Sequence, residues 1–423
     1  MTEPKRVGVV GLGYVGLPLS LALHRAGYEV VGVDIDDRKV EQLSNGRSTI
    51  SDVPDEDVVD GLAEGLTFSS DYASLGDIDA VSICVPTPLG KTDTPDLSFV
   101  IDAAERLAPI LPDGATIILE STVYPGATEE IIGAILADNG MSLGEDIYLA
   151  FSPERIDPGN KDYEPTNIPK VLGGVTAACG DHAVALYEPV FDEVVRVDSA
   201  SEAEFVKLLE NTFRAVNIGL INELAQVAHE LDVNIWSVID AAATKPFGFM
   251  PFYPGPGLGG HCIPIDPFFL SWKASQQGID TPFIHLADQV NRAMPEHVVQ
   301  MVIEQLNDRG IALSNADILV LGAAYKPDVS DTRESAAIDI IDQLTDWKST
   351  VTYHDPHVPE LDVLGTRHQS VELTTDRLAD ADCVLLVTDH TAFDVEEIVE
   401  HASLVVDTRN ATGDYDGEHL VRL

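Results

Sequence analysis

Residues 6–16 read RVGVVGLGYVG, an apolar run that leads into three glycines in the pattern GxGxxG. The run is typical of a buried strand, and LPLSLALHRAG at residues 17–27 continues as an amphipathic helix that ends at Gly27. Asp34 ends the next apolar run, EVVGVD at residues 29–34. A strand, a glycine turn, a helix and a following acidic residue predict a dinucleotide-binding βαβ unit.

Each residue of this motif has a physical role. Gly11 permits the tight turn, Gly13 lets the backbone approach a pyrophosphate, and Gly16 allows the helix to pack closely on the strand. Asp34 accepts hydrogen bonds from the ribose hydroxyls and repels a 2′-phosphate, which favours NAD over NADP. The alternative is a glycine-rich turn that binds no ligand.

The rest of the chain repeats the alternation of strands and helices, except in its middle. Short apolar runs and helical segments alternate up to about residue 200, helical patterns follow, and the alternation returns after residue 310. The two ends resemble each other: VGVVGLGY, EVVGVDID and DAVSICVPTP have counterparts in ILVLGAAY, TVTYHDPH and DCVLLVTDHT. The sequence therefore predicts an α/β fold with two Rossmann-like parallel-sheet domains, residues 1–200 and 306–423, joined by a central helical domain, residues 201–305.

Charge and cysteine usage exclude several classes of protein. The chain has 25 Lys and Arg against 71 Asp and Glu, a net charge of −46, so neither nucleic acid nor an anionic membrane is an expected partner. The excess is spread along the chain, which favours a salt-rich cytosol and predicts loss of structure at low ionic strength. The N-terminus lacks a signal peptide, and no apolar run is long enough to span a membrane, so we expect a soluble cytoplasmic protein.

The four cysteines, Cys84, Cys179, Cys262 and Cys383, form no CxxC pair. This spacing argues against a disulfide framework or a zinc ribbon, and we expect no metal site. Cys262 lies in PGPGLGGHCIPIDP, residues 254–267, where glycines leave the sulfur accessible and prolines fix φ. A thiolate with the nearby Asp266 suits covalent chemistry on a carbonyl. The alternatives are an inert thiol in a demanding loop, or metal binding with His261, for which two further ligands are missing.

Further polar residues stand where a site is expected. Lys207, Asn211 and Arg214 share one face of a helix that begins near residue 202, together with Glu204. That face is either a solvated stripe or part of a site. Thr87 and Thr122 each follow a strand, where open α/β sheets bind ligands but where hydroxyls also commonly close turns.

Seven stretches occur in the order of a known family: GLGYVGLPLS, VPTP, ESTVYPG, SPER, VKLLENTFRAVNIGLINEL, PGPGLGGHCIPIDP and AYKPDVSDTRES. Over nearly its full length the chain resembles the nucleotide-sugar 6-dehydrogenases, the UDP-glucose/GDP-mannose dehydrogenase family. The resemblance implies an NAD-binding domain, a helical centre that forms a homodimer, and a C-terminal domain that binds a UDP-sugar.

The resemblance also implies a four-electron oxidation of a sugar C6 hydroxyl to a carboxylate with two NAD. Cys262 then adds to the intermediate aldehyde, and the thiohemiacetal becomes a thioester that water hydrolyses. Lys207 resembles the residue that stabilises the oxyanion or relays a proton, Asn211 is its hydrogen-bonding partner, and Asp266 positions or activates water.

Other positions carry over from the same motifs. Thr122 and Glu154 match residues near the reacting C6. The implied substrate contacts are Glu154, Arg155, Ile156, Lys207, Asn211, Arg214, Gly259, Tyr325 and Lys326. The implied cofactor contacts are Gly11, Gly13, Tyr14, Val15, Gly16, Asp34, Thr87, Thr122 and Arg333.

The sequence of the cysteine loop indicates which sugar nucleotide is the substrate. UDP-glucose members of the family carry GGSCFPKD, whereas this chain has His261 before the cysteine and Ile265 before Asp266. GGHC with DP is more typical of members that act on N-acetylated sugars, and the form here resembles UDP-N-acetylglucosamine 6-dehydrogenases. UDP-ManNAc, UDP-GalNAc and UDP-glucose stay open as substrates. A one-step NAD-dependent hydroxyacid dehydrogenase and a catalytically silent nucleotide-sugar sensor are the other functions to test.

Overall fold

A computed structural model describes residues 5–50, 53–90, 93–156 and 165–423. The chain divides into two compact units: Met1–Glu210 with Phe268–Asp280, and Asn211–Pro267 with Thr281–Leu423. The expected boundaries at residues 200 and 305 stay a prediction. Among helices of the described ranges, none has both the length and the apolar character needed to cross a bilayer. The cytoplasmic location likewise stays a prediction.

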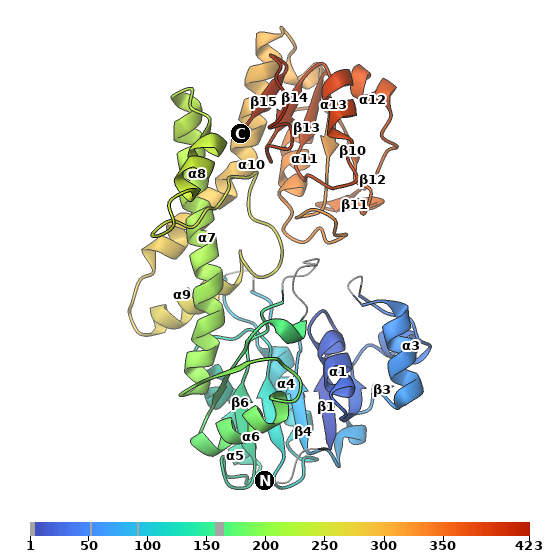
Figure 1. The fold of residues 1–423 in the computed structure, drawn as a ribbon, viewed down its shortest axis with the longest axis vertical. Helices are drawn as coiled ribbons and strands as arrows, with labels where there is room; N and C mark the ends of the chain where they lie inside the picture. The colour runs from blue at the N-terminus through green and yellow to red at the C-terminus, as the bar shows by residue number, and fades with distance from the viewer. Residues whose placement is uncertain (1–4, 51–52, 91–92, 157–164) are drawn as a thin grey trace. The chain divides into compact units, whose positions relative to one another are not determined.

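The first unit is built on an eight-stranded sheet with the strand order β3-β2-β1-β4-β5-β6-β7-β8 (Figure 1). The expected α/β architecture is confirmed, with one difference: β7 runs antiparallel to β6, so the sheet is parallel except at that pair. The strands are β1 (Arg6–Val10), β2 (Glu29–Val33), β3 (Thr67–Ser69), β4 (Ala80–Ile83), β5 (Thr116–Leu119), β6 (Tyr148–Phe151), β7 (Lys170–Gly174) and β8 (Val194–Val197).

Helices cover this sheet because its central strands are apolar on both faces. Every residue of β4 and of β5 is buried, as expected of strands in a mainly parallel sheet. The helices are α1 (Gly16–Arg25), α2 (Asp37–Ser44), α3 (Asp55–Glu64), α4 (Ser98–Leu107), α5 (Ala134–Asp138) and α6 (Ala177–Tyr187). A π-helical turn, Thr128–Gly133, leads into α5.

The second unit contains a five-stranded parallel sheet with the order β10-β9-β13-β14-β15 and a separate hairpin of β11 and β12. The strands are β9 (Asp317–Leu321), β10 (Thr350–His354), β11 (Glu360–Val363), β12 (Thr366–Gln369), β13 (Cys383–Leu386), β14 (Val405–Asp407) and β15 (Leu420–Arg422). The helices are α8 (Ile235–Ala243), α10 (Pro282–Asp308), α11 (Ala336–Asp346), α12 (Thr375–Asp380) and α13 (Val395–His401).

The helical centre predicted from the sequence consists mainly of long helices. The longest, α7, spans Ala200–Glu230 and carries Lys207 and Asn211 one turn apart. Pro282 starts α10 at a position where its missing N–H costs nothing. The helix α9 (Asp266–Gln276) follows the cysteine loop directly.

The two sheets repeat one another in register, as the similarity of the two chain ends predicts. Val7 pairs with Val30 and Ala80 in the first sheet, and the corresponding Ile318 pairs with Val351 and Cys383 in the second. The strand order β2-β1-β4 therefore has its counterpart in β10-β9-β13. In both sheets the loops that follow these strands lie at one edge, where open α/β sheets bind ligands.

Candidate active site

The glycine turn after β1 has the shape that a dinucleotide site needs. Gly11 adopts φ +91°, and a Cβ there would lie 2.6 Å from the carbonyl oxygen of Cys84. A Cβ on Gly16 would lie 1.7 Å from the carbonyl oxygen of Gly11, so helix and turn touch. A Cβ on Gly13 would meet nothing within 4 Å, which leaves that backbone open to a ligand. No side chain caps the start of α1, and the positive end of its dipole suits an anionic pyrophosphate.

Asp34 lies directly after β2, and its carboxylate is fixed against the turn. Its Oδ2 accepts from the amide of Leu12 at 2.9 Å, and its Oδ1 accepts from the amide of Asp36 at 3.0 Å. Lys39 also donates from Nζ to Oδ2 at 2.6 Å. This ammonium beside the carboxylate was missed in the sequence, although its position one turn into α2 is a signal that could have revealed it.

The two threonines expected near the cofactor follow adjacent strands. Thr87 comes after β4 and Thr122 after β5, and both are half-buried. Ser121 ties the two loops together, because its hydroxyl donates to the carbonyl oxygen of Val85 at 2.6 Å. Tyr14 and Val15, in the turn before α1, are also half-buried. The first unit thus gathers the predicted cofactor residues at the carboxyl edge of its sheet, except Arg333, which belongs to the second unit.

Glu204 holds the loop that carries Thr122. The sequence placed Glu204 on the polar face of its helix, and the structure buries it completely. Its Oε1 accepts from the amide of Thr128 at 2.8 Å and from the Thr128 hydroxyl at 2.6 Å, while Oε2 accepts from the amide of Gly126. Burial raises the pKa of Glu204 to about 7, against the effect of these three donors.

Lys207 and Glu154 are in contact through the main chain. The ammonium of Lys207 donates to the carbonyl oxygen of Glu154 at 2.9 Å. The Glu154 side chain has another partner, because its Oε2 accepts from Nζ of Lys170 at 3.0 Å. Burial opposes ionisation of Glu154, but Lys170 and the amide of Ile156 hold its pKa below the ordinary value.

Arg155 and Ile156, two of the predicted substrate contacts, follow Glu154. The Arg155 guanidinium makes an ion pair with Glu210, at 2.6 Å between Nη2 and Oε1, and donates from Nη1 to the carbonyl oxygen of Pro169 at 2.8 Å. The amide of Ile156 donates to Oε1 of Glu154 at 2.7 Å.

Cys262 lies in the second unit, in a loop that packs closely on Tyr325. A Cβ on Gly259 would lie 2.5 Å from Cβ of Tyr325, and a Cβ on Gly260 would lie 3.0 Å from its ring. These glycines therefore have a packing role, in addition to the predicted role of leaving the sulfur of Cys262 accessible. Cys262 is half-buried, and its carbonyl oxygen accepts from the amides of Ile265 and Asp266 in a tight turn. In the described residues all four cysteines are free of disulfides.

Two of the predicted catalytic residues are in direct contact in this unit. Nδ2 of Asn211 donates to Oδ2 of Asp266 at 2.6 Å. Asp266 is 2% exposed, so this contact replaces water that the carboxylate has lost. Arg214, on the same helix, is exposed to solvent.

The loop after β9 contributes the remaining predicted residues. Nζ of Lys326 lies 5.9 Å from the ring centre of Tyr325. Arg333 makes an ion pair with Asp331, at 2.6 Å between Nη2 and Oδ2, and its carbonyl oxygen accepts from the amide of Gly260. This hydrogen bond joins the cysteine loop to the stretch DTRES.

Arg409 is a candidate site residue that sequence reasoning missed. It follows β14 at the same sheet edge as Lys326, and its guanidinium packs against Gly255 of the cysteine loop. Its Nε donates to the carbonyl oxygen of Val387 at 2.8 Å. Burial lowers the pKa of Arg409, although Asp389 and Asp407 oppose that effect. A cation shortly after an apolar run, as in LVVDTR at residues 404–409, is the signal that could have identified it.

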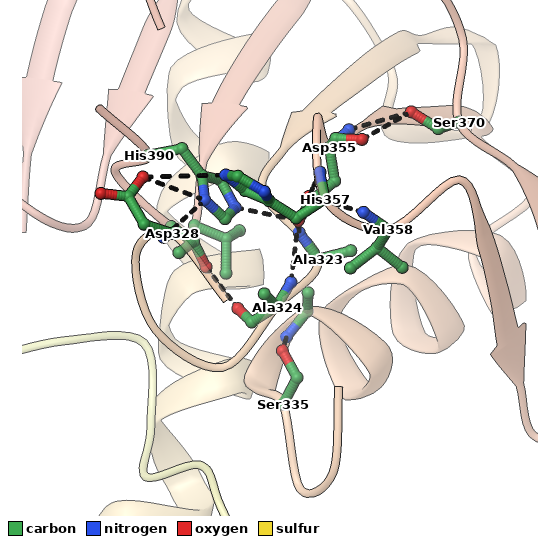
Figure 2. Close-up of polar contacts among 12 residues, drawn as sticks. Ala323, Ala324, Asp328, Ser335, Asp355, His357, Val358, Ser370 and His390 are labelled. Atoms are coloured by element: carbon green, nitrogen blue, oxygen red, sulfur yellow. Dashed lines mark hydrogen bonds and ion pairs between the residues drawn. The ribbon is translucent and has the colours of Figure 1, made fainter. Parts of the chain in front are cut away.

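Asp328, His357 and His390 also meet at this edge, with one potential ligand atom each within 4.8 Å of the others (Figure 2). Their hydrogen bonds explain the cluster without a metal. Nε2 of His390 lies 2.9 Å from Oδ2 of Asp355, and Nδ1 accepts from the amide of Asp328 at 3.0 Å. Because both nitrogens of this buried ring are engaged, His390 has no lone pair left for an ion.

Comparisons with known proteins agree with this geometry. Residues 5–191 match the UDP-glucose/GDP-mannose dehydrogenase family, NAD binding domain; residues 201–293 match its central domain; and residues 319–414 match its UDP binding domain. The UDP-N-acetyl-D-mannosamine dehydrogenase of Methanococcus maripaludis is 35% identical over 96% of this chain and 93% of its own. The UDP-N-acetyl-D-glucosamine 6-dehydrogenase of Salmonella typhi is 32% identical over 92% of this chain and 90% of its own.

A solved structure described as the UDP-D-ManNAc dehydrogenase of Pyrococcus horikoshii superposes with a TM-score of 0.90 at 32% identity, covering 99% of this chain and 98% of that one. The three domain matches together cover most of the chain in the order that the sequence motifs predict. The chain therefore belongs to the UDP-glucose/GDP-mannose dehydrogenase family and is an NAD-dependent nucleotide-sugar dehydrogenase.

Proposed function

We propose that the chain oxidises the C6 hydroxyl of a UDP-N-acetylhexosamine to a carboxylate, with Cys262 as the covalent nucleophile. The observation that carries the proposal is the cysteine loop: Gly259 and Gly260 pack on Tyr325 with no room for side chains, and this places a half-buried thiol at the head of a rigid turn. A thiol that served only packing would fit on a strand or helix, as Cys383 does on β13.

The proposed chemistry uses the residues as follows. NAD, when bound, accepts the hydride in each of the two oxidations. Lys207, whose ammonium is anchored on the carbonyl oxygen of Glu154, stabilises the oxyanion that develops at C6. The sulfur of Cys262 adds to the aldehyde carbon, and the aldehyde oxygen takes up a proton. Loss of a second hydride gives a thioester, and attack by water releases the carboxylate and restores the thiol.

Asn211 and Asp266 have a joint role in the hydrolytic step. The amide of Asn211 holds one oxygen of the Asp266 carboxylate, which fixes its orientation. Held in this orientation, the Asp266 carboxylate accepts a proton from the attacking water. A fixed carboxylate acts faster than a mobile one because its orientation entropy is already lost.

The UDP part of the substrate requires cations, which are scarce in this acidic chain. Lys326 and Arg409 both follow strands at the carboxyl edge of the second sheet. We propose that these two residues bind the diphosphate, with Tyr325 and the loop 254–260 beside them. An arginine fork and a lysine point charge are common partners of phosphate oxygens.

The identity of the hexosamine stays a prediction. The cysteine loop favours UDP-GlcNAc, while relatives named for UDP-GlcNAc and for UDP-ManNAc match this chain to similar degrees. UDP-ManNAc is therefore the alternative to test first, followed by UDP-GalNAc and UDP-glucose.

We also propose that the enzyme works as a homodimer through α7. A stripe of large apolar side chains, four on the C-terminal part of this helix and one directly after it, is between 41% and 66% exposed: Phe213, Leu220, Leu224, Val227 and Leu231. Their spacing of seven, four, three and four residues puts them in one stripe, as in a helix that packs against another helix. A second copy presents the same stripe and can cover it by two-fold symmetry.

The test is the stoichiometry of NADH release with a panel of UDP-sugars at high salt. Two NADH per sugar support the proposal, and one NADH per product supports a one-step hydroxyacid dehydrogenase. Cys262→Ser should stop the reaction at or before the second oxidation. Cys179→Ala, at a buried cysteine of α6, is the matched control and should keep the wild-type stoichiometry. Full uronate formation by Cys262→Ala would exclude the covalent route.

A further inference from the structure

A buried network of charged and polar groups lies behind Glu154. Lys170, at the start of β7, has a side chain that is 4% exposed, and Glu120, after β5, has one that is completely buried. Nζ of Lys170 lies 2.7 Å from Oε2 of Glu120 and 3.0 Å from Oε2 of Glu154. One lysine thus bridges two carboxylates in the interior of the first unit. Burying three charges is costly unless each has a fixed role or partner.

The far end of the network fixes Glu120. The hydroxyl of Tyr187, on α6, donates to Oε1 of Glu120 at 2.5 Å and lies 2.9 Å from the hydroxyl of Ser82. Burial raises the pKa of Tyr187 well above its ordinary value, so it stays a neutral donor. Both oxygens of Glu120 therefore have partners, and the fixed Glu120 carboxylate in turn fixes the ammonium of Lys170.

The near end of the network fixes Glu154. Oε1 of Glu154 accepts from the amides of Arg155 and Ile156, both at 2.7 Å, and Oε2 accepts from Lys170. While both carboxylate oxygens are engaged in this way, the main-chain carbonyl oxygen of Glu154 accepts from the ammonium of Lys207. The side chain that the sequence suggested as a group near the reacting carbon is thus committed to the protein interior.

We propose that Lys170, backed by Glu120, is a positioning residue that keeps Glu154 a fixed anion and aims its carbonyl oxygen at Lys207. Glu154 then accepts no proton during turnover, and its role is to place the ammonium of Lys207. This inference rests on the proposed function of Lys207 and assigns a role to two residues that were not among the predicted site residues.

The charges around Glu154 agree with a permanently ionised carboxylate. Lys170 from β7 and Lys207 from α7 are the cations that act on Glu154, whereas burial raises the pKa of Glu120, which shares the Lys170 ammonium. Cys84, after β4, also faces the network, but burial raises the pKa of its thiol well above the ordinary value, so it is uncharged. Burial alone would raise the pKa of Glu154, so loss of Lys170 should let this carboxylate take up a proton.

The experiment compares variants of the full chain as kcat and KM between pH 5.5 and 9. Lys170→Met removes the charge but keeps the length of the side chain, and Lys170→Met with Glu120→Gln avoids a lone buried carboxylate at Glu120. Both should show a new loss of kcat on the acidic side of neutrality. We expect a fall of about tenfold or more there, the equivalent of one charge-assisted hydrogen bond, with less than about threefold change in KM for NAD. Lys170→Arg is the conservative control and should restore most of kcat.

A second readout does not depend on turnover. Infrared difference spectra at pH 6, each variant minus the wild type, should show an added carbonyl stretch of a protonated carboxyl group in Lys170→Met with Glu120→Gln. The subtraction removes the band of Glu204, whose pKa of about 7 leaves it protonated at pH 6 in the wild type and in every variant. The added band should be absent when Glu154→Gln is included. If the wild type oxidises no UDP-sugar, the proposed function fails and this readout still decides the role of Lys170. An unchanged pH profile together with no new infrared band would overturn the inference.

Discussion

Replacement of Glu204 by glutamine tests how the loop that carries Thr122 is attached to α7. Glu204 is completely buried, and its carboxylate accepts from the amides of Gly126 and Thr128 and from the Thr128 hydroxyl. Burial raises its folded-state pKa to about 7 from an ordinary value of 4.5. Glutamine has the same shape, carries no charge and does not titrate.

The sign and size of the effect follow from the two pKa values. Because the folded-state pKa is the higher one, the stability contribution of this carboxyl group is fully present below pH 4.5 and is lost as the pH rises through about 7. The full loss is about 3 kcal/mol for a pKa difference of this size. The glutamine variant has no such loss, although one backbone amide then faces an NH₂ group, which costs about 1–3 kcal/mol at every pH.

The assay is thermal unfolding of wild type and Glu204→Gln at pH 5, 6, 7 and 8 with constant salt and protein concentration. The melting temperature of the wild type relative to the variant should fall by about 5–10 °C across this series, for a cooperative unit of roughly 200 residues. Glu223→Gln, at an exposed position of α7, is the matched control and should melt in parallel with the wild type. A constant difference between wild type and Glu204→Gln at all four pH values would refute the reasoning.

Three further outcomes are expected. Asp34→Ser should raise the preference for NADP over NAD, measured as the ratio of the two kcat/KM values, by about tenfold or more. The reason is that Nζ of Lys39 loses its carboxylate partner and can bind the 2′-phosphate instead. An unchanged ratio would contradict the assigned role of the pair. Leu224→Asp should convert the dimer to a monomer in light scattering, whereas Glu223→Gln should leave the mass unchanged; a monomeric wild type would reject the stripe as an interface. The far-UV circular dichroism of the wild type should be lost on transfer from about 2 M to about 0.05 M salt, where the charge of −46 is poorly screened, and an unchanged spectrum would remove the salt requirement.

The fold could be predicted to a large extent because it depends on local patterns. The apolar runs that became β1, β2, β4 and β5 are short and bounded by glycine, proline or charged residues, so periodicity alone located them. The antiparallel direction of β7 could not be read in this way, since an apolar run does not reveal which neighbour it pairs with or in which direction.

The site was predictable where a motif imposes a backbone constraint. Gly11 and Gly16 are such cases, because any side chain there would collide with the main chain. The ion pair of Lys170 and Glu120 was not predictable, because its two residues are distant in sequence and meet only in the folded chain. The helical pattern placed Glu204 beside Lys207, but only the tertiary structure decides that its carboxylate is buried under the loop 126–128.

The two sheets show why one strand–turn–acid unit binds a dinucleotide while its internal counterpart does not. Asp34 and Asp355 occupy the same register position, and each accepts from a backbone amide of the turn after the first strand. In the register of β4 and β13, Thr87 corresponds to His390. Nε2 of His390 lies 2.9 Å from Oδ2 of Asp355 (Figure 2), so the imidazole takes up the acceptor that a ribose would need.

Thr87 has a short side chain in place of the imidazole, and Asp34 accepts instead from the amides of Leu12 and Asp36 and from Nζ of Lys39. Because a carboxylate can accept about four or more hydrogen bonds, these three donors leave lone pairs on Asp34 for the ribose. In the second sheet Asp355 accepts from five donors, four backbone amides and His390, and the cations Lys326 and Arg409 follow strands at that same edge. A carboxylate so fully engaged has little capacity left for a ribose, whereas cations suit a diphosphate. The exchange of one small side chain for an imidazole at equivalent positions is therefore one physical difference between the two similar edges.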